Sequence, residues 1–113
     1  YFFEPSFDLS KNNYSGLATL NINFETMERS FEGEVSENMT ILDALNMSVS
    51  VGEIKLNYAL DSSGNVSVKE IDGHISGINN KYFVFYLNSK RVDEKFLNKI
   101  KINTGDTIEI RNE

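Results

Sequence analysis

Apolar and polar residues alternate along most of this chain, and only one segment has the spacing of a helix. Alternation places every second side chain on one face, which is typical of strands that are buried on one side. A sheet of such strands needs one covering layer, and one short helix can supply it, so the pattern predicts an α+β fold. The expected strands, in chain order, are 20–24, 31–35, 54–60, 66–71, 82–87 and 108–110, with a short return strand at Val92.

The helix is predicted to begin directly after Thr40. The Thr40 hydroxyl can accept a hydrogen bond from the first turn, and Asp43, three residues later, can reach back to the Thr40 backbone, as in a capping box. Ile41 and Leu45 would share the face that packs on the sheet. Gly52 is a suitable end. The predicted helix therefore has about three turns.

The order of the strands favours particular neighbours. Residues 26–29 break the alternation and are expected to form the turn of an opening hairpin. Residues 82–87 are apolar on both faces, which favours a central strand.

Composition limits the classes of function. The 113 residues suit one domain, with 1–16 as an extended lead-in and 17–113 as the folded unit. A net charge of −6 gives no electrostatic reason to bind nucleic acid. No stretch is long and apolar enough to cross a membrane, so we expect no membrane insertion by this segment. Cysteine is absent, which excludes disulfides and thiolate chemistry. As a separate expectation, the chain is a monomer.

Three motifs together resemble one known family. Residues 40–45 (TILDAL) are similar to the helix start "TvldAL" of β-grasp proteins. Residues 83–88 (FVFYLN) and 102–109 (INTGDTIE) look like the "WmyyvN" strand and the closing "l.dGD.I.w" of one branch of them. That branch resembles the C-terminal domain of transcobalamin and intrinsic factor, and its members are largely uncharacterised secreted or surface microbial proteins.

The resemblance implies a β-grasp (ubiquitin-like) mixed sheet crossed by one short helix, with extra hairpin strands. In that arrangement the first regular strand and the last are buried neighbours, and the helix crosses between the hairpin and the remaining strands. It also implies an extracytoplasmic location, secreted or at the cell surface, and a role that is not enzymatic. Cobalamin follows as a ligand by resemblance only, and no other cofactor is implied. Two residues depart from the family pattern, since Phe83 replaces the usual tryptophan and Ser89 follows Asn88 where glycine is usual.

The candidate ligand-binding residues are Phe83, Tyr86 and Asn88. Because side chains alternate along 82–87, either the set containing Phe83 or the set containing Tyr86 faces the helix. The other set lines a sheet face that could receive a ligand, and the sequence leaves open which set that is. No catalytic residue and no metal ligand is predicted.

Other chemistry-bearing residues fit simpler interpretations. His74 has no second histidine or cysteine near it in sequence and is expected to be a loop residue. The glutamates of the opening hairpin could bind calcium, but no calcium-loop spacing is present, so a solvated face is favoured. No serine has the spacing of a nucleophile elbow. Glycosylation motifs outside the predicted helix begin at Asn13, Asn38 and Asn65.

Two functions remain open. The first is a binding module for a small ligand, a glycan or a protein, held on the sheet or its loops. The alternative is a structural, adhesion or assembly domain of a surface protein that acts through the edge of a strand. An enzyme is not expected, because the groups needed for catalysis are missing.

Overall fold

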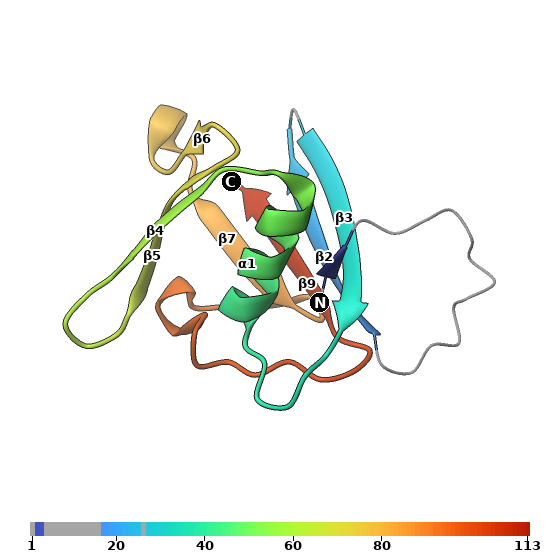
Figure 1. The fold of residues 1–113 in the computed structure, drawn as a ribbon. Coiled ribbons are helices and arrows are strands. Elements are labelled where there is room, and N and C mark those ends of the chain that lie inside the picture. Colours follow the sequence, from blue (N-terminus) through green and yellow to red (C-terminus); the bar gives the residue numbers. More distant parts are fainter. Residues whose placement is uncertain (1, 4–16, 26) are drawn as a thin grey trace.

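A computed structural model describes residues 2–3, 17–25 and 27–113. Its main sheet has six strands in the order β1-β3-β2-β9-β7-β8, and a smaller sheet has the order β4-β5-β6. One helix, α1, lies across one face of the main sheet (Figure 1). The fold is therefore α+β. The strands are β1 (Phe2–Phe3), β2 (Leu17–Phe24), β3 (Met27–Glu34), β4 (Leu56–Leu60), β5 (Val66–Ile71), β6 (His74–Ile75), β7 (Phe83–Leu87), β8 (Lys90–Val92) and β9 (Thr107–Asn112).

The centre of the main sheet is the parallel pair formed by β2 and β9, in which Leu20 lies opposite Ile108. This pair joins the first long strand to the last, as the sequence predicted. Hairpin partner β3 flanks β2 on one side, and β7 pairs antiparallel with β9 on the other. Leu20, Ile108 and their neighbours two residues on, Ile22 and Ile110, have no exposed surface.

Helix α1 (Ile41–Gly52) begins and ends where the sequence predicted. The backbone N–H of Asp43 donates to Thr40 Oγ1 over 3.2 Å, and the Thr40 N–H donates to Asp43 Oδ2 over 3.0 Å. The capping box is thus complete. Ile41 and Leu45 are fully buried against the sheet, and Glu53 ends the helix with a φ of 55°.

The structure corrects three details of the predicted strands. Strand β3 begins at Met27, which is paired with Phe24, so the hairpin turn is tighter than the predicted 26–29. Strand β4 begins at Leu56, because Ile54 is a buried residue of the preceding connection. Strand β7 lies between β8 and β9 and is not central. The segment is apolar on both faces for another reason. Val84 is buried on the face of the sheet that points away from the core beneath α1.

The predicted lead-in lies mostly outside the described residues. Phe2 and Phe3 form β1 and pair with Gly33 and Glu32 at the outer edge of β3. In the described part of the chain, no helix has the length and apolar character needed to cross a membrane.

The smaller sheet is attached beside the helix. Tyr58 of β4 receives a hydrogen bond from Asn46 Nδ2 of α1 at its hydroxyl, over 3.2 Å. The backbone N–H of Val68 in β5 donates to the carboxylate of Glu94, which belongs to the short 3-10 helix η3 (Glu94–Phe96). From these anchors the β4–β5 hairpin extends away from the body of the molecule (Figure 1).

Candidate functional site

The face of the main sheet opposite α1 is covered by no element of the described chain (Figure 1). The strand register fixes which side chains share this face. Asn21 lies opposite both Ser30 and Glu109, and Tyr86 lies opposite Glu109. Because opposed residues point to the same side, a polar row crosses four strands. We call this surface the open face, and the polar residues of this row and beside it are Asn21, Asn23, Glu28, Ser30, Tyr86, Glu109 and Arg111.

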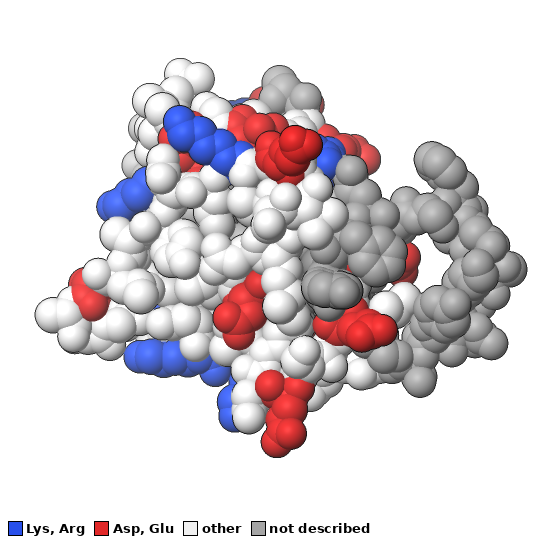
Figure 2. Space-filling view, in the orientation of Figure 1, with Lys and Arg blue, Asp and Glu red and all other residues white. Residues whose placement is uncertain are grey.

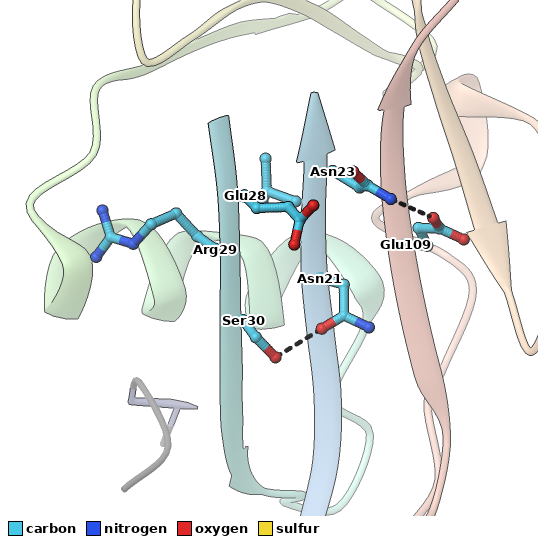
Figure 3. A pocket seen from close by; sticks show the side chains of 7 residues that line it. Asn21, Asn23, Glu28, Arg29, Ser30 and Glu109 are labelled. Carbon is cyan, nitrogen blue, oxygen red and sulfur yellow. Dashed lines mark hydrogen bonds between the residues drawn. The ribbon is translucent and has the colours of Figure 1, made fainter. Parts of the chain in front are cut away.

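A shallow hollow of about 310 Å³ lies on the open face over β2, β3 and β9. Amide, carboxylate and hydroxyl groups line it, and Figure 3 shows them pointing out from the sheet. Ser30 Oγ donates to Asn21 Oδ1 over 2.6 Å. Arg29 turns away from the others toward α1, where its guanidinium donates to the Gly52 carbonyl oxygen over 3.5 Å. The side chains that remain in the hollow are those of Asn21, Asn23, Glu28, Ser30 and Glu109.

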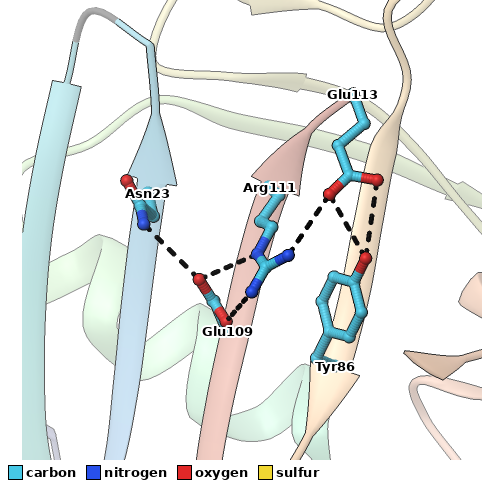
Figure 4. Close-up of polar contacts among 5 residues, drawn as sticks. All are labelled: Asn23, Tyr86, Glu109, Arg111 and Glu113. Carbon is cyan, nitrogen blue, oxygen red and sulfur yellow. Dashed lines mark hydrogen bonds and ion pairs between the residues drawn. The ribbon is translucent and has the colours of Figure 1, made fainter. Parts of the chain in front are cut away.

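A chain of polar contacts borders the hollow on β9 and β7 (Figure 4). Asn23 Nδ2 donates to Glu109 Oε2 over 3.5 Å. Arg111 donates two bonds to the Glu109 carboxylate, from Nε over 2.9 Å and from Nη2 over 3.0 Å. The same guanidinium reaches Glu113, which also accepts from the Tyr86 hydroxyl over 3.2 Å. These contacts hold Glu109 in one orientation beside the hollow.

Arg111 also sets the charge of Glu109. Its hydrogen bonds lower the pKa of the Glu109 carboxyl, although partial burial opposes them. In return, the hydrogen bond that Arg111 donates to Glu109 raises the pKa of Arg111 above its ordinary value. Both groups therefore stay ionised at neutral pH, and Glu109 offers the hollow a carboxylate that only accepts hydrogen bonds.

The three candidate ligand residues predicted from the sequence lie in different surroundings. Phe83 is 5% exposed and packs in the core, with its ring centroid 5.5 Å from that of Phe24. Tyr86 lies on the open face. Asn88 occupies the β7–β8 turn, where its amide donates to Asp106 Oδ1 over 2.8 Å and accepts from the Thr107 N–H over 2.9 Å. The structure therefore brings only Tyr86 to the surface near the hollow.

The β7–β8 turn places both Asn88 and Ser89 in the left-handed conformation. Both residues have positive φ, 52° and 70°, as the central positions of a two-residue hairpin of type I′ require. Asparagine tolerates this conformation well, whereas serine adopts it at a cost that glycine would avoid. Asn88 thus acts on the fold by tying the turn to the start of β9.

Two of the predicted glycosylation motifs can be placed. Asn38 is exposed in the turn before α1, with a φ of 64°. Asn65 is half-buried in the β4–β5 turn, where its backbone N–H donates to Asp61 Oδ1 over 2.9 Å. Asn13 lies outside the described residues.

A second hollow, of about 440 Å³, contains the single histidine. His74 belongs to β6, and its ring centroid lies 4.8 Å from that of Phe24. Glu25 and Lys81 also line the hollow and form an ion pair of 2.6 Å, which lowers the pKa of Glu25. Among the described residues, no serine or threonine lines this hollow. Across the described residues, no group of three or more histidines, aspartates or glutamates is placed to hold a metal ion.

Of the residues that line the hollow on the open face, the sequence singled out only Glu28, as one of the hairpin glutamates interpreted as a solvated face. The sequence signal for the other residues lies in the polar positions that alternate with apolar ones along the expected strands. In 20–24 the polar positions are Asn21 and Asn23, and in 108–110 the polar position is Glu109. Each looked like an ordinary solvated position, because their proximity depends on the parallel pairing of β2 with β9.

Comparison with known proteins shows likeness in structure only. No protein-family model matches the sequence, and no curated protein matches it. The crystal structure of a putative metal binding protein from Ruminococcus gnavus ATCC 29149 is similar, with a TM-score of 0.66 and 11% identity; 86% of this chain and 95% of that one are covered. Haptocorrin in complex with Cbi is also similar, with a TM-score of 0.69 and 14% identity, over 89% of this chain.

The chain spans about a quarter of haptocorrin, 26% of its length. At these identities the similarity concerns the fold alone. The transcobalamin-like resemblance seen in the sequence motifs therefore extends to the arrangement of helix and strands.

Proposed function

We propose that this chain is a non-enzymatic binding module that holds a saccharide on its open face. One observation carries the proposal, namely the hollow lined by two amides, two carboxylates and a hydroxyl. Sugar hydroxyl groups both donate and accept hydrogen bonds, so they need amides and carboxylates placed close together. A shallow polar hollow can receive a ring or two of a glycan while leaving the rest of the glycan in solvent.

The fixed orientation of the lining favours binding. Arg111 holds Glu109, and Asn21 and Ser30 hold each other, before any ligand arrives. Groups that are already ordered lose little conformational entropy on binding. Tyr86 adds an aromatic ring at the border of the hollow, although the Arg111 guanidinium covers one of its faces.

The charge state of Glu109 supports binding over hydrolysis. A glycosidase needs one carboxylic acid with a raised pKa, so that it can give a proton to the leaving sugar. The pKa of Glu109 is instead lowered by Arg111. Glu109 is therefore suited to accept hydrogen bonds from hydroxyl groups and unsuited to donate a proton to a glycosidic oxygen.

A β-grasp fold is part of this proposal. It is supported by a parallel β2–β9 pair flanked by the β2–β3 hairpin and by β7, with α1 crossing one face. An extracytoplasmic location is also part of it, and its support is the motif resemblance together with an exposed Asn38.

Cobalamin remains the ligand implied by resemblance, and haptocorrin, a structural neighbour, was crystallised with Cbi. Of the residues first expected to face such a ligand, Phe83 is buried. The polar hollow therefore supports a hydroxyl-rich ligand more directly, and cobalamin serves as a comparison ligand in the test.

The test is a glycan array followed by calorimetry with any saccharide that is bound. Asn23→Ala removes one lining amide and should weaken binding about five- to tenfold, as the loss of one hydrogen bond would. Asn57→Ala is the matched control. Asn57 is also an exposed strand asparagine bonded to a glutamate, with Nδ2 3.1 Å from Glu70 Oε1, but it lies on β4.

Binding by Asn57→Ala should equal that of the unmodified protein. An array without any bound saccharide, or an equal loss in both variants, would overturn the proposal. Binding of cobinamide with no saccharide bound would replace the saccharide with that ligand.

A second candidate function is an assembly domain that acts through a strand edge. One observation favours it. Strand β4 is an edge of the smaller sheet and carries no charged residue between Leu56 and Leu60.

A further inference from the structure

Edge strand β4 has no charged residue and no proline, the residues that usually protect such an edge. Exposed strand edges are normally guarded by charged residues, prolines or bulges that discourage pairing with another chain. Edge strand β8 follows this rule, since Lys90 and Arg91 occupy two of its three positions. Strand β4 has the sequence Leu-Asn-Tyr-Ala-Leu and pairs only with β5 among the described strands. On the side where the β4–β5 hairpin extends, Figure 2 shows separate basic and acidic groups with uncharged surface between them.

The hydrogen bonds that flank β4 reveal which of its backbone groups are free. The Lys55 carbonyl accepts from the Asp72 N–H over 2.7 Å, and the Asp61 N–H donates to the Asn65 carbonyl over 3.1 Å. Both bonds run toward the β5 side. Backbone groups alternate in direction along an antiparallel strand, so the groups of Leu56, Tyr58 and Leu60 point outward.

Two further observations agree with this assignment. Val68, the partner of Tyr58, donates its N–H to Glu94, away from β4. The Tyr58–Val68 pair is therefore one that exchanges no ladder bonds. The register shift near Asn57 leaves the extra residue, Lys69, on β5, so β4 itself stays continuous.

We infer that the outer edge of β4 pairs with β4 of a second copy of this chain, antiparallel and with the two-fold axis at Tyr58. This inference deepens the second candidate function and does not depend on the ligand of the open face. It also replaces the monomer expected from the sequence. In this register the outward groups of Tyr58 bond to those of Tyr58 in the second copy, and those of Leu56 bond to Leu60.

The side chains around Tyr58 are self-complementary in that register. Leu56, half-buried at the edge of the core, comes to lie opposite Leu60 of the second copy. Leu60 is 54% exposed, a large apolar surface that the pairing would cover. One residue further out on each side, Lys55 faces Asp61 of the second copy. Leucine therefore lies opposite leucine, and oppositely charged residues lie opposite each other at both ends of the pair. An interface between identical copies requires this kind of self-complementarity.

Sedimentation velocity over a concentration series up to about 1 mM would detect a dimer with a Kd in that range. Leu60→Lys places a charge on the edge and should raise the dimer Kd about tenfold or more. Ile75→Lys is the matched control, because Ile75 is 51% exposed and lies on β6. Its dimer Kd should stay unchanged.

A cysteine trap tests the register. The chain has no cysteine, so a single introduced thiol reports only on its own position. Tyr58→Cys would place two thiols across a hydrogen-bonded pair about 5.5 Å apart at Cα, within the reach of a disulfide. Ala59→Cys is the control, because Ala59 would lie opposite Asn57 of the second copy. Circular dichroism checks that both variants fold, since Tyr58 is half-buried.

A disulfide-linked dimer from Tyr58→Cys and little from Ala59→Cys would support the inference. A monomer at every concentration would overturn it, as would a dimer that Ile75→Lys weakens as much as Leu60→Lys does. Equal crosslinking of both cysteine variants would overturn the two-fold at Tyr58. None of these outcomes changes what the glycan array reports on the open face.

Discussion

The guanidinium carbon of Arg111 lies 4.5 Å from the centre of the Tyr86 ring, while the nitrogens of the same group hold Glu109. Guanidinium groups stack on aromatic rings and still donate hydrogen bonds in their own plane. Arg111 of β9 therefore positions both Glu109, two residues away on the same strand, and Tyr86 of β7. Much of the fixed orientation of the side chains on the open face depends on Arg111.

Arg111→Ala should raise the pKa of Glu109 toward its ordinary value, because the hydrogen bonds that lower it would be lost. Arg111→Lys keeps the charge but loses the bidentate geometry, so we expect a smaller rise. An NMR titration of the side-chain carboxyl carbons measures this directly. An unchanged pKa in Arg111→Ala would contradict the role of Arg111. Glu25, which is paired with Lys81, serves as the internal control and should titrate as in the unmodified protein.

Glu94 should make the protein less stable as the pH rises. Burial raises the pKa of the Glu94 carboxyl above its ordinary value, so the folded protein binds this proton more tightly than the unfolded chain does. The free energy of unfolding therefore falls as the pH rises from about 4.5 through the raised pKa. Glu94→Gln keeps an acceptor for the Val68 N–H and should lack this part of the pH dependence.

Urea unfolding at several pH values measures the effect. The difference in stability between Glu94→Gln and the unmodified protein should shift in favour of the glutamine as the pH rises. Glu94→Ala leaves the Val68 N–H without its acceptor and should cost about 1–3 kcal/mol. Parallel pH profiles for the glutamine variant and the unmodified protein would show that Glu94 is not the group responsible.

Gly52→Ala should destabilise the fold, although alanine is the better helix former. A methyl group at this position would lie 2.7 Å from Phe31 Cζ and 2.9 Å from Cε1. Phe31 is fully buried, so a shift of its ring would disturb the close packing of the core around it. Overpacking of this kind costs about 1–3 kcal/mol, more than the roughly 1 kcal/mol of helix propensity gained.

Thermal unfolding of Gly52→Ala can be compared with that of Ser50→Ala, an exposed position in the same helix. The serine variant should be unchanged or slightly more stable. Equal stability of Gly52→Ala and Ser50→Ala would contradict this prediction. It would mean that the Phe31 ring can shift at little cost in free energy despite its burial.

Thr40→Ala should cost about 1 kcal/mol of stability, because the Asp43 N–H loses the hydroxyl that caps it. Thr40→Ser retains the hydroxyl and should stay close to the unmodified protein. Chemical denaturation with both variants isolates the hydroxyl from the methyl group. Equal losses in the two would attribute the effect to packing, since serine and alanine both lack that methyl group.

The local structure of this chain could largely be read from its residues. Thr40 and Asp43 predicted the helix start, because a capping box involves groups only three residues apart. The alternation over 20–24 and 108–110 predicted strands and the residues they bury, because a strand has a period of two. The exact bounds of β3 and β4 were less well predicted, since pairing with a partner strand decides where a strand begins.

The site needed the tertiary structure. Asn23 and Glu109 are separated by 86 residues, and only the parallel β2–β9 pair brings them within hydrogen-bond distance. The sequence also did not decide which face of 82–87 meets the helix. The pairing of Phe85 with Ile110 places Phe83 in the core and Tyr86 outside it.

Period, caps and turn residues are local properties, so composition and spacing are enough to predict them. Neighbours across a sheet are not local, because any of several strands could satisfy the same alternation. The polar hollow and the free edge of β4 both arise from the order in which strands lie side by side. That order minimises the exposed apolar surface of the whole chain at once, and no short segment contains it.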